Sequence, residues 1–112
     1  MKGTRLATIV ATAGAAIALA APAQADDYDY VFKNTVNAFG VYGPQDQLAW
    51  LGKISCDRIG RGVDGDAYKS ANFIQRNLPR GTSEGQAFQF LGASIDHYCP
   101  DQADFLQRAG AH

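Results

Sequence analysis

Apolar residues recur every three or four positions along the chain from residue 26 onward, and no alternating run typical of a β-strand interrupts them. The first stripe lies between Asp27 and Phe39 and is followed by Gly40, a residue typical of the position after a helix C-terminus. Its members are Tyr28, Val31, Phe32, Val36 and Phe39. The pattern predicts an all-α fold that begins with one amphipathic helix.

Two more helices are predicted in the middle of the chain. The second helix begins after Pro44, because proline is favourable near a helix start, and Gly60 and Gly62 mark its end. Its expected inner face contains Leu48, Leu51, Gly52, Ser55, Cys56 and Ile59. The third helix runs from about Asp64 or Gly65 to a point just before Pro79. Its expected inner face contains Ala67, Ala71, Ile74 and Leu78.

The fourth helix has the clearest start signal, because Ser83 and Gln86 are spaced as a capping box. It ends at Pro100, and its predicted inner face contains Ala87, Phe88, Leu91, Ile95 and Tyr98. A short fifth helix is predicted from Asp101 to Gly110, with Phe105 and Leu106 on the core. We therefore expect one small domain of four helices, or five with this last segment, packed as a bundle or at orthogonal angles.

The first 25 residues have the pattern of a secretory signal peptide. Lys2 and Arg5 precede a stretch from Leu6 to Ala21 with nothing more polar than threonine, and Ala23-Gln24-Ala25 forms an A-x-A cleavage site. A membrane-spanning helix is the alternative, but spanning takes roughly 20 apolar residues and this stretch is shorter. Cleavage after Ala25 would leave residues 26–112 as one secreted, extracytoplasmic domain without a membrane span.

The charge of the mature chain argues against nucleic acid as a partner. Without Lys2 and Arg5, eight basic residues remain against eleven acidic ones, a formal charge of −3. Asp57, Asp64 and Asp66 are interleaved with the central basic residues, which favours a solvated face over a phosphate-binding surface. Those basic residues are Arg58, Arg61, Lys69, Arg76 and Arg80.

The two cysteines, Cys56 and Cys99, are expected to form one disulfide in an oxidising compartment. The bond would close a loop of about 44 residues, for which chain entropy predicts about 4 kcal/mol of stabilisation. The alternative is a nucleophilic Cys99, which needs a base within hydrogen-bond distance. His97 lies two residues away, but on a helix this spacing directs the side chains to nearly opposite sides.

Gly52 lies one turn before Cys56, and Gly92 lies two turns before Cys99. A glycine inside a helix costs up to about 1 kcal/mol relative to alanine, so both glycines need a structural reason. We expect the second and fourth helices to cross closely at these glycines, because a disulfide requires Cα atoms within about 7 Å.

Candidate catalytic and metal-binding groups are sparse. After the predicted leader the histidines are His97 and His112, so no metal and no cofactor are expected. Haem ligation by Tyr98 or His97 is an alternative to a packed tyrosine and a histidine at the edge of the core. Asp57 and Asp96 lie opposite the core stripes, where a carboxylate is usually hydrated. No nucleophile elbow or phosphate-binding loop is present, so we expect no enzymatic activity.

Three apolar residues lie outside the predicted core stripes: Trp50, Ile54 and Phe73. One interpretation is that the second helix is central and buried on two sides, as in small bundles. The other is that these residues form an exposed apolar patch or groove for a lipid, another apolar ligand or a partner protein. The exposure of Trp50 separates the two interpretations.

Three segments carry a resemblance to a known family: VFKNTVNAFGVYG, LAWLGKISCDRIGRG and TSEGQAFQFLGASIDHYCP. They resemble the small secreted proteins of mycobacteria and related actinobacteria grouped as domain of unknown function 732. The matching positions are Leu51, Gly52, Cys56, Gly62, Ala87, Tyr98, Cys99 and Pro100. Trp50 is larger than the family pattern leads us to expect. The resemblance implies an exported helical protein that is secreted or envelope-associated, in a family without an assigned reaction and with some members of interest as antigens.

The sequence thus favours a secreted, non-enzymatic small helical protein that acts as an interaction module in the envelope or on a host surface. The alternative is a carrier of a small apolar ligand, such as a lipid or a haem-like molecule, in an aromatic-lined pocket. A ligand that copurifies with the protein would distinguish the carrier from the interaction module.

Overall fold

The computed structural model describes residues 26–110, which form helices, turns and loops and no strand. The predicted signal peptide and His112 lie outside the described residues. The first helix spans residues 26–37, and the elements after it are α2 (Gln45–Gly60), α3 (Ala67–Arg76), α4 (Glu84–Tyr98), the short 3-10 helix η1 (Pro100–Gln102) and α5 (Asp104–Gly110). The predicted all-α fold is confirmed, including the short fifth helix near the C-terminus.

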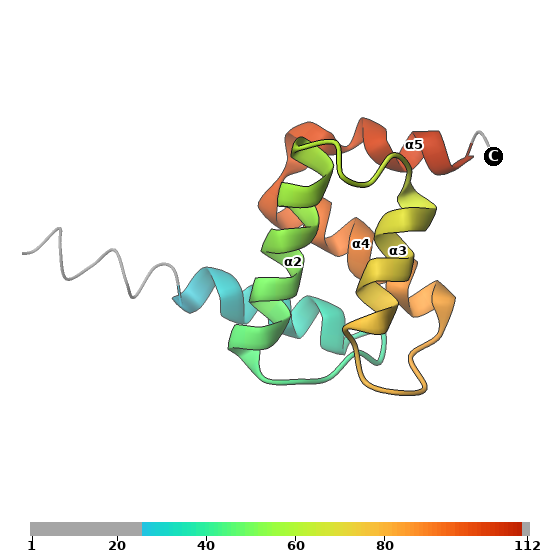
Figure 1. The fold of residues 1–112 in the computed structure, drawn as a ribbon. Coiled ribbons are helices and arrows are strands. Elements are labelled where there is room, and N and C mark those ends of the chain that lie inside the picture. The colour runs from blue at the N-terminus through green and yellow to red at the C-terminus, as the bar shows by residue number, and fades with distance from the viewer. Residues whose placement is uncertain (1–25, 111–112) are drawn as a thin grey trace, which may run out of the picture.

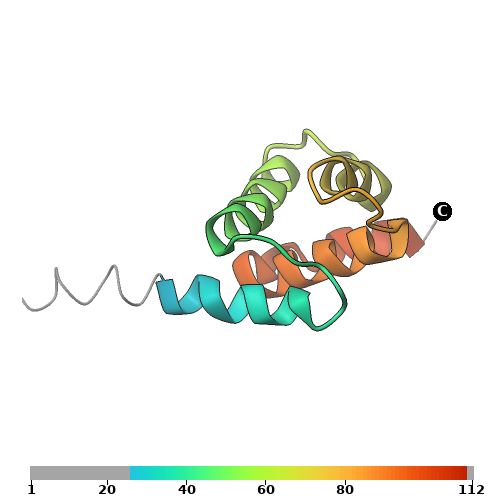
Figure 2. The ribbon, with the colours of Figure 1, turned by 90° about the horizontal axis from the view of Figure 1, so that it is seen from below.

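The helix α4 is the centre of the fold. Both α2 and α3 pack on it and lie side by side, and α5 crosses one end (Figure 1). The first helix runs alongside α4, as Figure 2 shows. Its direction is opposite, because Tyr28 stacks on His97 in the last turn of α4 while Gln86 in the first turn of α4 donates to the Phe39 carbonyl.

The core is built around Phe90 of α4, which is fully buried and meets Phe32 edge to face with ring centroids 5.4 Å apart. The sequence pattern placed Phe88 on the inner face instead, but Phe88 is only half-buried and lies against Tyr68. Other helices cover α4 on more than one side, so its buried arc is wider than a single stripe. The largest fully buried side chains include Phe32, Phe90, Phe105, Leu51, Ile74, Leu91 and Ile95.

The predicted capping box at the start of α4 is confirmed. Ser83 Oγ accepts a hydrogen bond from the Gln86 backbone N–H at 3.0 Å, and Gln86 Oε1 accepts one from the Ser83 N–H at 2.9 Å. The predicted bounds of α2 also hold, since it follows Pro44 and ends at Gly60. Gly62 has a φ of +74°, a left-handed conformation that favours glycine.

The third helix begins later and ends earlier than predicted. It starts at Ala67, not at Asp64 or Gly65, because Asp66 caps it by accepting a hydrogen bond from a backbone N–H of the first turn at 3.0 Å. It ends at Arg76, two residues before the predicted end. An N-cap residue has a non-helical backbone conformation, so the helix can begin only after Asp66.

Only part of the first predicted stripe is buried. Phe32 and Val36 have no exposed surface, whereas Tyr28 and Val31 are 50% and 53% exposed. The prediction that Tyr28 and Val31 share the buried face is therefore wrong. The first helix lies at the edge of the fold (Figure 2), so only a narrow arc around Phe32 and Val36 is covered, and Val31 points about 100° away from Phe32.

The disulfide between Cys56 and Cys99 is present, with the two Cα atoms 6.0 Å apart. Cys56 lies about one turn before the end of α2 and Cys99 directly follows α4, so the bond ties the C-terminal part of one helix to the end of the other. Both cysteines of the chain are in this bond. The nucleophilic alternative for Cys99 therefore has no thiol in this structure.

The two mid-helix glycines differ. A Cβ atom at Gly52 would lie 2.9 Å from ring atoms of both Phe32 and Tyr98. A Cβ atom at Gly92 would have no neighbour within 4 Å. The predicted close approach is therefore found at Gly52, where α2 meets rings from the first helix and α4, and the prediction is wrong for Gly92.

Candidate functional site

The three residues of the predicted apolar patch differ in exposure. Trp50 is 51% exposed on α2, whereas Ile54 and Phe73 are partly buried and pack against the core. The Arg58 guanidinium covers Phe73, with its central carbon 3.9 Å from the ring centroid. The interpretation in which α2 is buried on two sides therefore fails at Trp50.

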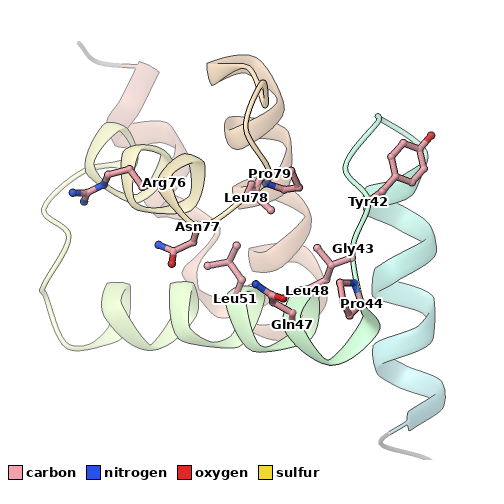
Figure 3. Close-up of a pocket in the computed structure, with 10 residues that line it drawn as sticks. All are labelled: Tyr42, Gly43, Pro44, Gln47, Leu48, Leu51, Arg76, Asn77, Leu78 and Pro79. Carbon is pink, nitrogen blue, oxygen red and sulfur yellow. The ribbon is translucent and has the colours of Figure 1, made fainter.

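A cleft of about 400 Å³ lies between the loop before α2 and the segment after α3 (Figure 3). The buried residues Leu48 and Leu51 of α2 form its floor, and Leu78 lines the opposite side. In Figure 3, Asn77 points toward Leu51, whereas Arg76 extends away from the cleft. The volume lies in the range of about 300–1,000 Å³ that is typical of small-molecule sites.

Two other hollows adjoin this cleft. One, of about 250 Å³, shares Tyr42 and Pro79 with the cleft and is also lined by Arg80. The other shares Pro44 with the cleft and is lined by three aspartates, Asp26, Asp27 and Asp46. The surface is therefore acidic beside Pro44 and basic beside Pro79, and Arg76 is one of the residues that line the cleft itself.

Hydrogen bonds hold the two walls of the cleft. On one side, Gln86 Nε2 donates to the Phe39 carbonyl at 3.1 Å, so the side chain that closes the capping box also fixes the end of the first helical segment. On the other side, Gln75 Nε2 donates to the Thr82 carbonyl at 3.0 Å and Thr82 Oγ1 donates to the Pro79 carbonyl at 2.6 Å. The shape of the cleft is thus set by the fold.

A cluster of aromatic and polar side chains joins the first helix to the end of α4. The Tyr28 and His97 rings stack with centroids 3.9 Å apart, the Tyr28 hydroxyl donates to the His97 carbonyl, and His97 Nε2 lies 2.8 Å from the Tyr28 carbonyl oxygen. The Tyr98 hydroxyl donates to Asp29 at 2.7 Å, and Asp29 also pairs with Lys53 at 3.2 Å. Burial and the Asp29 carboxylate raise the pKa of Tyr98. His97 and Tyr98, the alternative haem ligands, are both engaged in helix packing.

Arg58 and Asp64 form an ion pair, with Asp64 buried, that the sequence pattern did not predict. Asp64 is 4% exposed and accepts hydrogen bonds from Arg58 Nε at 3.1 Å, Arg58 Nη2 at 2.9 Å and Ser70 Oγ at 2.9 Å. Burial alone would raise the pKa of Asp64, but these hydrogen bonds and the charge of Arg58 outweigh it and hold the pKa below its usual value. The interpretation of the central basic residues as one solvated face is therefore wrong for Arg58.

The candidate carboxylates lie apart from the cleft. Asp57 forms an exposed ion pair with Arg61 at 2.8 Å, and Asp96 is exposed on α4. Within residues 26–110, no three side chains of histidine, cysteine, aspartate or glutamate are grouped so that they would hold a metal ion. No helix in the same range combines the length and apolar character needed to cross a membrane.

Comparison with known proteins identifies the family. The sequence profile described as "Protein of unknown function (DUF732)" matches residues 24–101. The chain belongs to this family. Two relatives from two strains of Mycobacterium tuberculosis, the uncharacterized proteins MT0585 and Rv0559c, are each 71% identical over 110 residues, which covers 98% of this chain and 98% of theirs. No solved structure matches the chain.

The DUF732 resemblance in the sequence is therefore confirmed. The cleft differs from the predicted aromatic-lined pocket, because Tyr42 is the one aromatic residue in its lining and Trp50, Ile54 and Phe73 do not line it. The cleft itself was not predicted. Its lining comes from residues 42–51 and 76–79, two segments that no local pattern connects. The sequence contains only an indirect signal for the cleft. Pro44 marks the loop before the second helix and Pro79 marks the loop after the third. Which loops lie together is decided by how α2 and α3 pack on α4.

Proposed function

We propose that this DUF732 protein is a secreted, non-enzymatic interaction module that acts outside the cytoplasm. The Cys56–Cys99 disulfide supports an oxidising compartment, and the leader-like pattern of the first 25 residues supports export. The observation that carries the proposal is the exposure of aromatic side chains on a small cross-linked scaffold. Five of them are between 48% and 65% exposed: Tyr28, Tyr30, Tyr42, Trp50 and Tyr68.

Trp50 is the strongest candidate contact residue. Tryptophan and tyrosine are enriched at the energetically important positions of protein interfaces, because they bury a large area and lose little conformational freedom. Trp50 lies on the outer face of α2, one turn from the charged residues Asp46 and Lys53. An aromatic residue flanked by charges matches the pattern of an apolar contact with a polar rim.

The polar side chains that pair inside this fold hold helices together, which also favours an interaction function located on the protein surface. The Arg58–Asp64 pair joins the loop before α3 to α2, and the Tyr98–Asp29 hydrogen bond joins α4 to the first helix. Each group therefore has a packing role that accounts for its position. The exposed side chains are therefore the ones that would contact a partner.

Site-specific photo-crosslinking tests the proposal. A benzophenone amino acid in place of Trp50, in protein exported by a mycobacterial culture, is expected to give one discrete crosslinked product. The matched control is the same substitution at Val63, which is 49% exposed and lies on a loop. Excess purified wild-type domain should compete the product away and a Trp50→Ala domain should not. Equal crosslinking at both positions, or none at Trp50, would refute the interaction module.

Export is tested by the mass of the secreted protein. We expect a chain that begins at Asp26, is about 2 Da lighter than the dithiol, and gains two alkyl groups only after reduction. A product that retains residues 1–25, or that alkylates at Cys56 or Cys99 without reduction, would contradict export to an oxidising compartment.

A carrier of a small apolar ligand is the second candidate function, and the cleft over Leu48 and Leu51 favours it. The ligand would be bound without covalent chemistry. Mass spectrometry of the secreted protein under native and then denaturing conditions is expected to show an added mass that denaturation removes. A native mass equal to that of the polypeptide would count against the carrier and leave the interaction module standing.

A further inference from the structure

We infer that the cleft between α2 and the segment after α3 binds a single-chain anionic amphiphile, with its apolar chain over Leu48 and Leu51 and its anionic head at Arg80. This inference rests on the carrier function proposed above and names the class of ligand. The ligand is a free molecule with one hydrocarbon chain and one carboxylate or similar anionic group.

The cleft is suited to a hydrocarbon chain. Tyr42 and Pro79 are exposed and Leu78 is partly buried, so these side chains offer apolar surface that no other part of the fold covers. Leu51 and Leu48 close the bottom of the cleft. Covering this surface with a chain would remove apolar area from water, which is the main driving force for such binding.

Charge selects the sign and the direction of the ligand. No acidic side chain lines either the cleft or the adjoining hollow that contains Arg80. Arg80 is exposed, and none of the ion pairs found in the described part of the chain includes it. The aspartates Asp26, Asp27 and Asp46 line the hollow that joins the cleft at Pro44 and would repel an anion there. Arg76 also lines the cleft, but its side chain extends away from it (Figure 3) and its Nε donates to the Asn72 carbonyl at 3.4 Å. An anionic head is therefore favoured at Arg80.

The walls of the cleft favour a free amphiphile with one hydrocarbon chain as the ligand, and not the surface of a lipid bilayer. Proteins that lie on membranes usually present an amphipathic helix with lysine and arginine along one face. Here the apolar surface lies in a hollow between two loops, near residues 42–44 and 77–79. The bonds from Gln86 and Gln75 already hold these loops, so a ligand would not have to order them.

The test is a titration of the disulfide-intact secreted protein with decanoate below its micelle concentration. Backbone amide chemical shifts locate the site, and the fluorescence of Trp50, the one tryptophan, gives a second signal because Trp50 lies one turn from Gln47 in the cleft lining. Decyltrimethylammonium supplies the same chain with the opposite charge. Phosphatidylglycerol vesicles supply an anionic bilayer.

We expect decanoate to shift amides in residues 42–51 and 77–81 and to bind about tenfold more tightly than decyltrimethylammonium, since the sign of the interaction with Arg80 reverses. Arg80→Gln should weaken decanoate binding about three- to fivefold. Arg61→Gln is the matched control, because Arg61 is exposed and lines none of these hollows, and it should leave the affinity unchanged. Gln47→Phe should fill the cleft and abolish binding, with circular dichroism confirming that the variant is folded.

Other results would overturn the inference. Equal affinity for the two amphiphiles, or equal weakening by Arg80→Gln and Arg61→Gln, would refute the anionic head at Arg80 and leave the carrier function standing. Shifts confined to other residues would refute the site. Binding to vesicles but not to decanoate would show that the source of the anion is a membrane. Absence of binding to either amphiphile would refute the inference, while the native mass of the secreted protein decides the carrier and the crosslinking at Trp50 decides the interaction module.

Discussion

Replacing Gly52 by alanine tests how closely three helices meet at the centre of this protein. The new Cβ atom would lie 2.9 Å from Phe32 Cζ and 2.9 Å from Tyr98 Cε2, well inside the 3.5–4.0 Å at which carbon atoms normally pack. Phe32 is fully buried and the Tyr98 hydroxyl is bonded to Asp29, so neither ring moves aside freely. We therefore expect the Gly52→Ala protein to be less stable than a protein in which alanine replaces a helix glycine that has free space around it.

The magnitude follows from two opposing effects. Glycine to alanine inside a helix stabilises by about 1 kcal/mol. An added methyl group in a packed core costs about 1–3 kcal/mol. Gly92 lies within α4 and a Cβ atom there meets nothing within 4 Å, so Gly92→Ala isolates the first effect. We expect Gly52→Ala to be less stable than Gly92→Ala by about 1–3 kcal/mol.

Thermal unfolding of the disulfide-intact protein, followed by circular dichroism, measures both variants. For a domain of this size each kcal/mol shifts Tm by about 4–8 °C. Gly92→Ala should raise Tm above the wild type, and Gly52→Ala should fall below Gly92→Ala by at least about 4 °C. An equal rise in Tm for the two variants would refute the close approach at Gly52.

Further substitutions test the crosslink, the buried ion pair and the exposed indole. Replacing Cys56 and Cys99 together by alanine should cost up to about 4 kcal/mol in urea unfolding, and a loss under about 1 kcal/mol would contradict the stabilising role of the bond. Asp64→Asn should cost about 1–3 kcal/mol at neutral pH, because it removes the charge that Arg58 pairs with. Because the folded state lowers the pKa of Asp64, this contribution is present above the unfolded value of about 3.9 and is lost as the pH falls below it, so the stability of Asp64→Asn should decline less than that of the wild type from about pH 4 to 2. Trp50→Ala should change the unfolding free energy by less than about 0.5 kcal/mol, and a larger loss would place the indole in the core.

Local sequence signals predicted the helices well. The capping box of Ser83 and Gln86 set the start of α4, and Gly60 set the end of α2. These signals work because a cap or a glycine acts on backbone groups within one turn. The disulfide was also predictable, since a chain with two cysteines has one possible internal pairing.

The burial of individual side chains, which depends on how several helices pack together, was predicted less accurately. Val31 was expected to be buried with Phe32, yet it is 53% exposed because the first helix lies at the edge of the fold. Phe90 was missed because α4 is covered on more than one side. Periodicity identifies which residues share a face, but the width of the buried arc depends on how many neighbours pack against that helix.

The sequence by itself determined the all-α fold, the crosslink and the family, because each follows from short-range pattern or residue identity. The leader stays a prediction from the same kind of pattern. Only the tertiary structure decided which loops meet, and so it alone defined the cleft over Leu48 and Leu51 with Arg80 at its basic end. It also decided that Asp64 binds Arg58 across a turn and does not remain in water. Such contacts are set by the packing of α2 and α3 on α4, whose side chains come from distant parts of the chain, and no local pattern in the sequence encodes that packing.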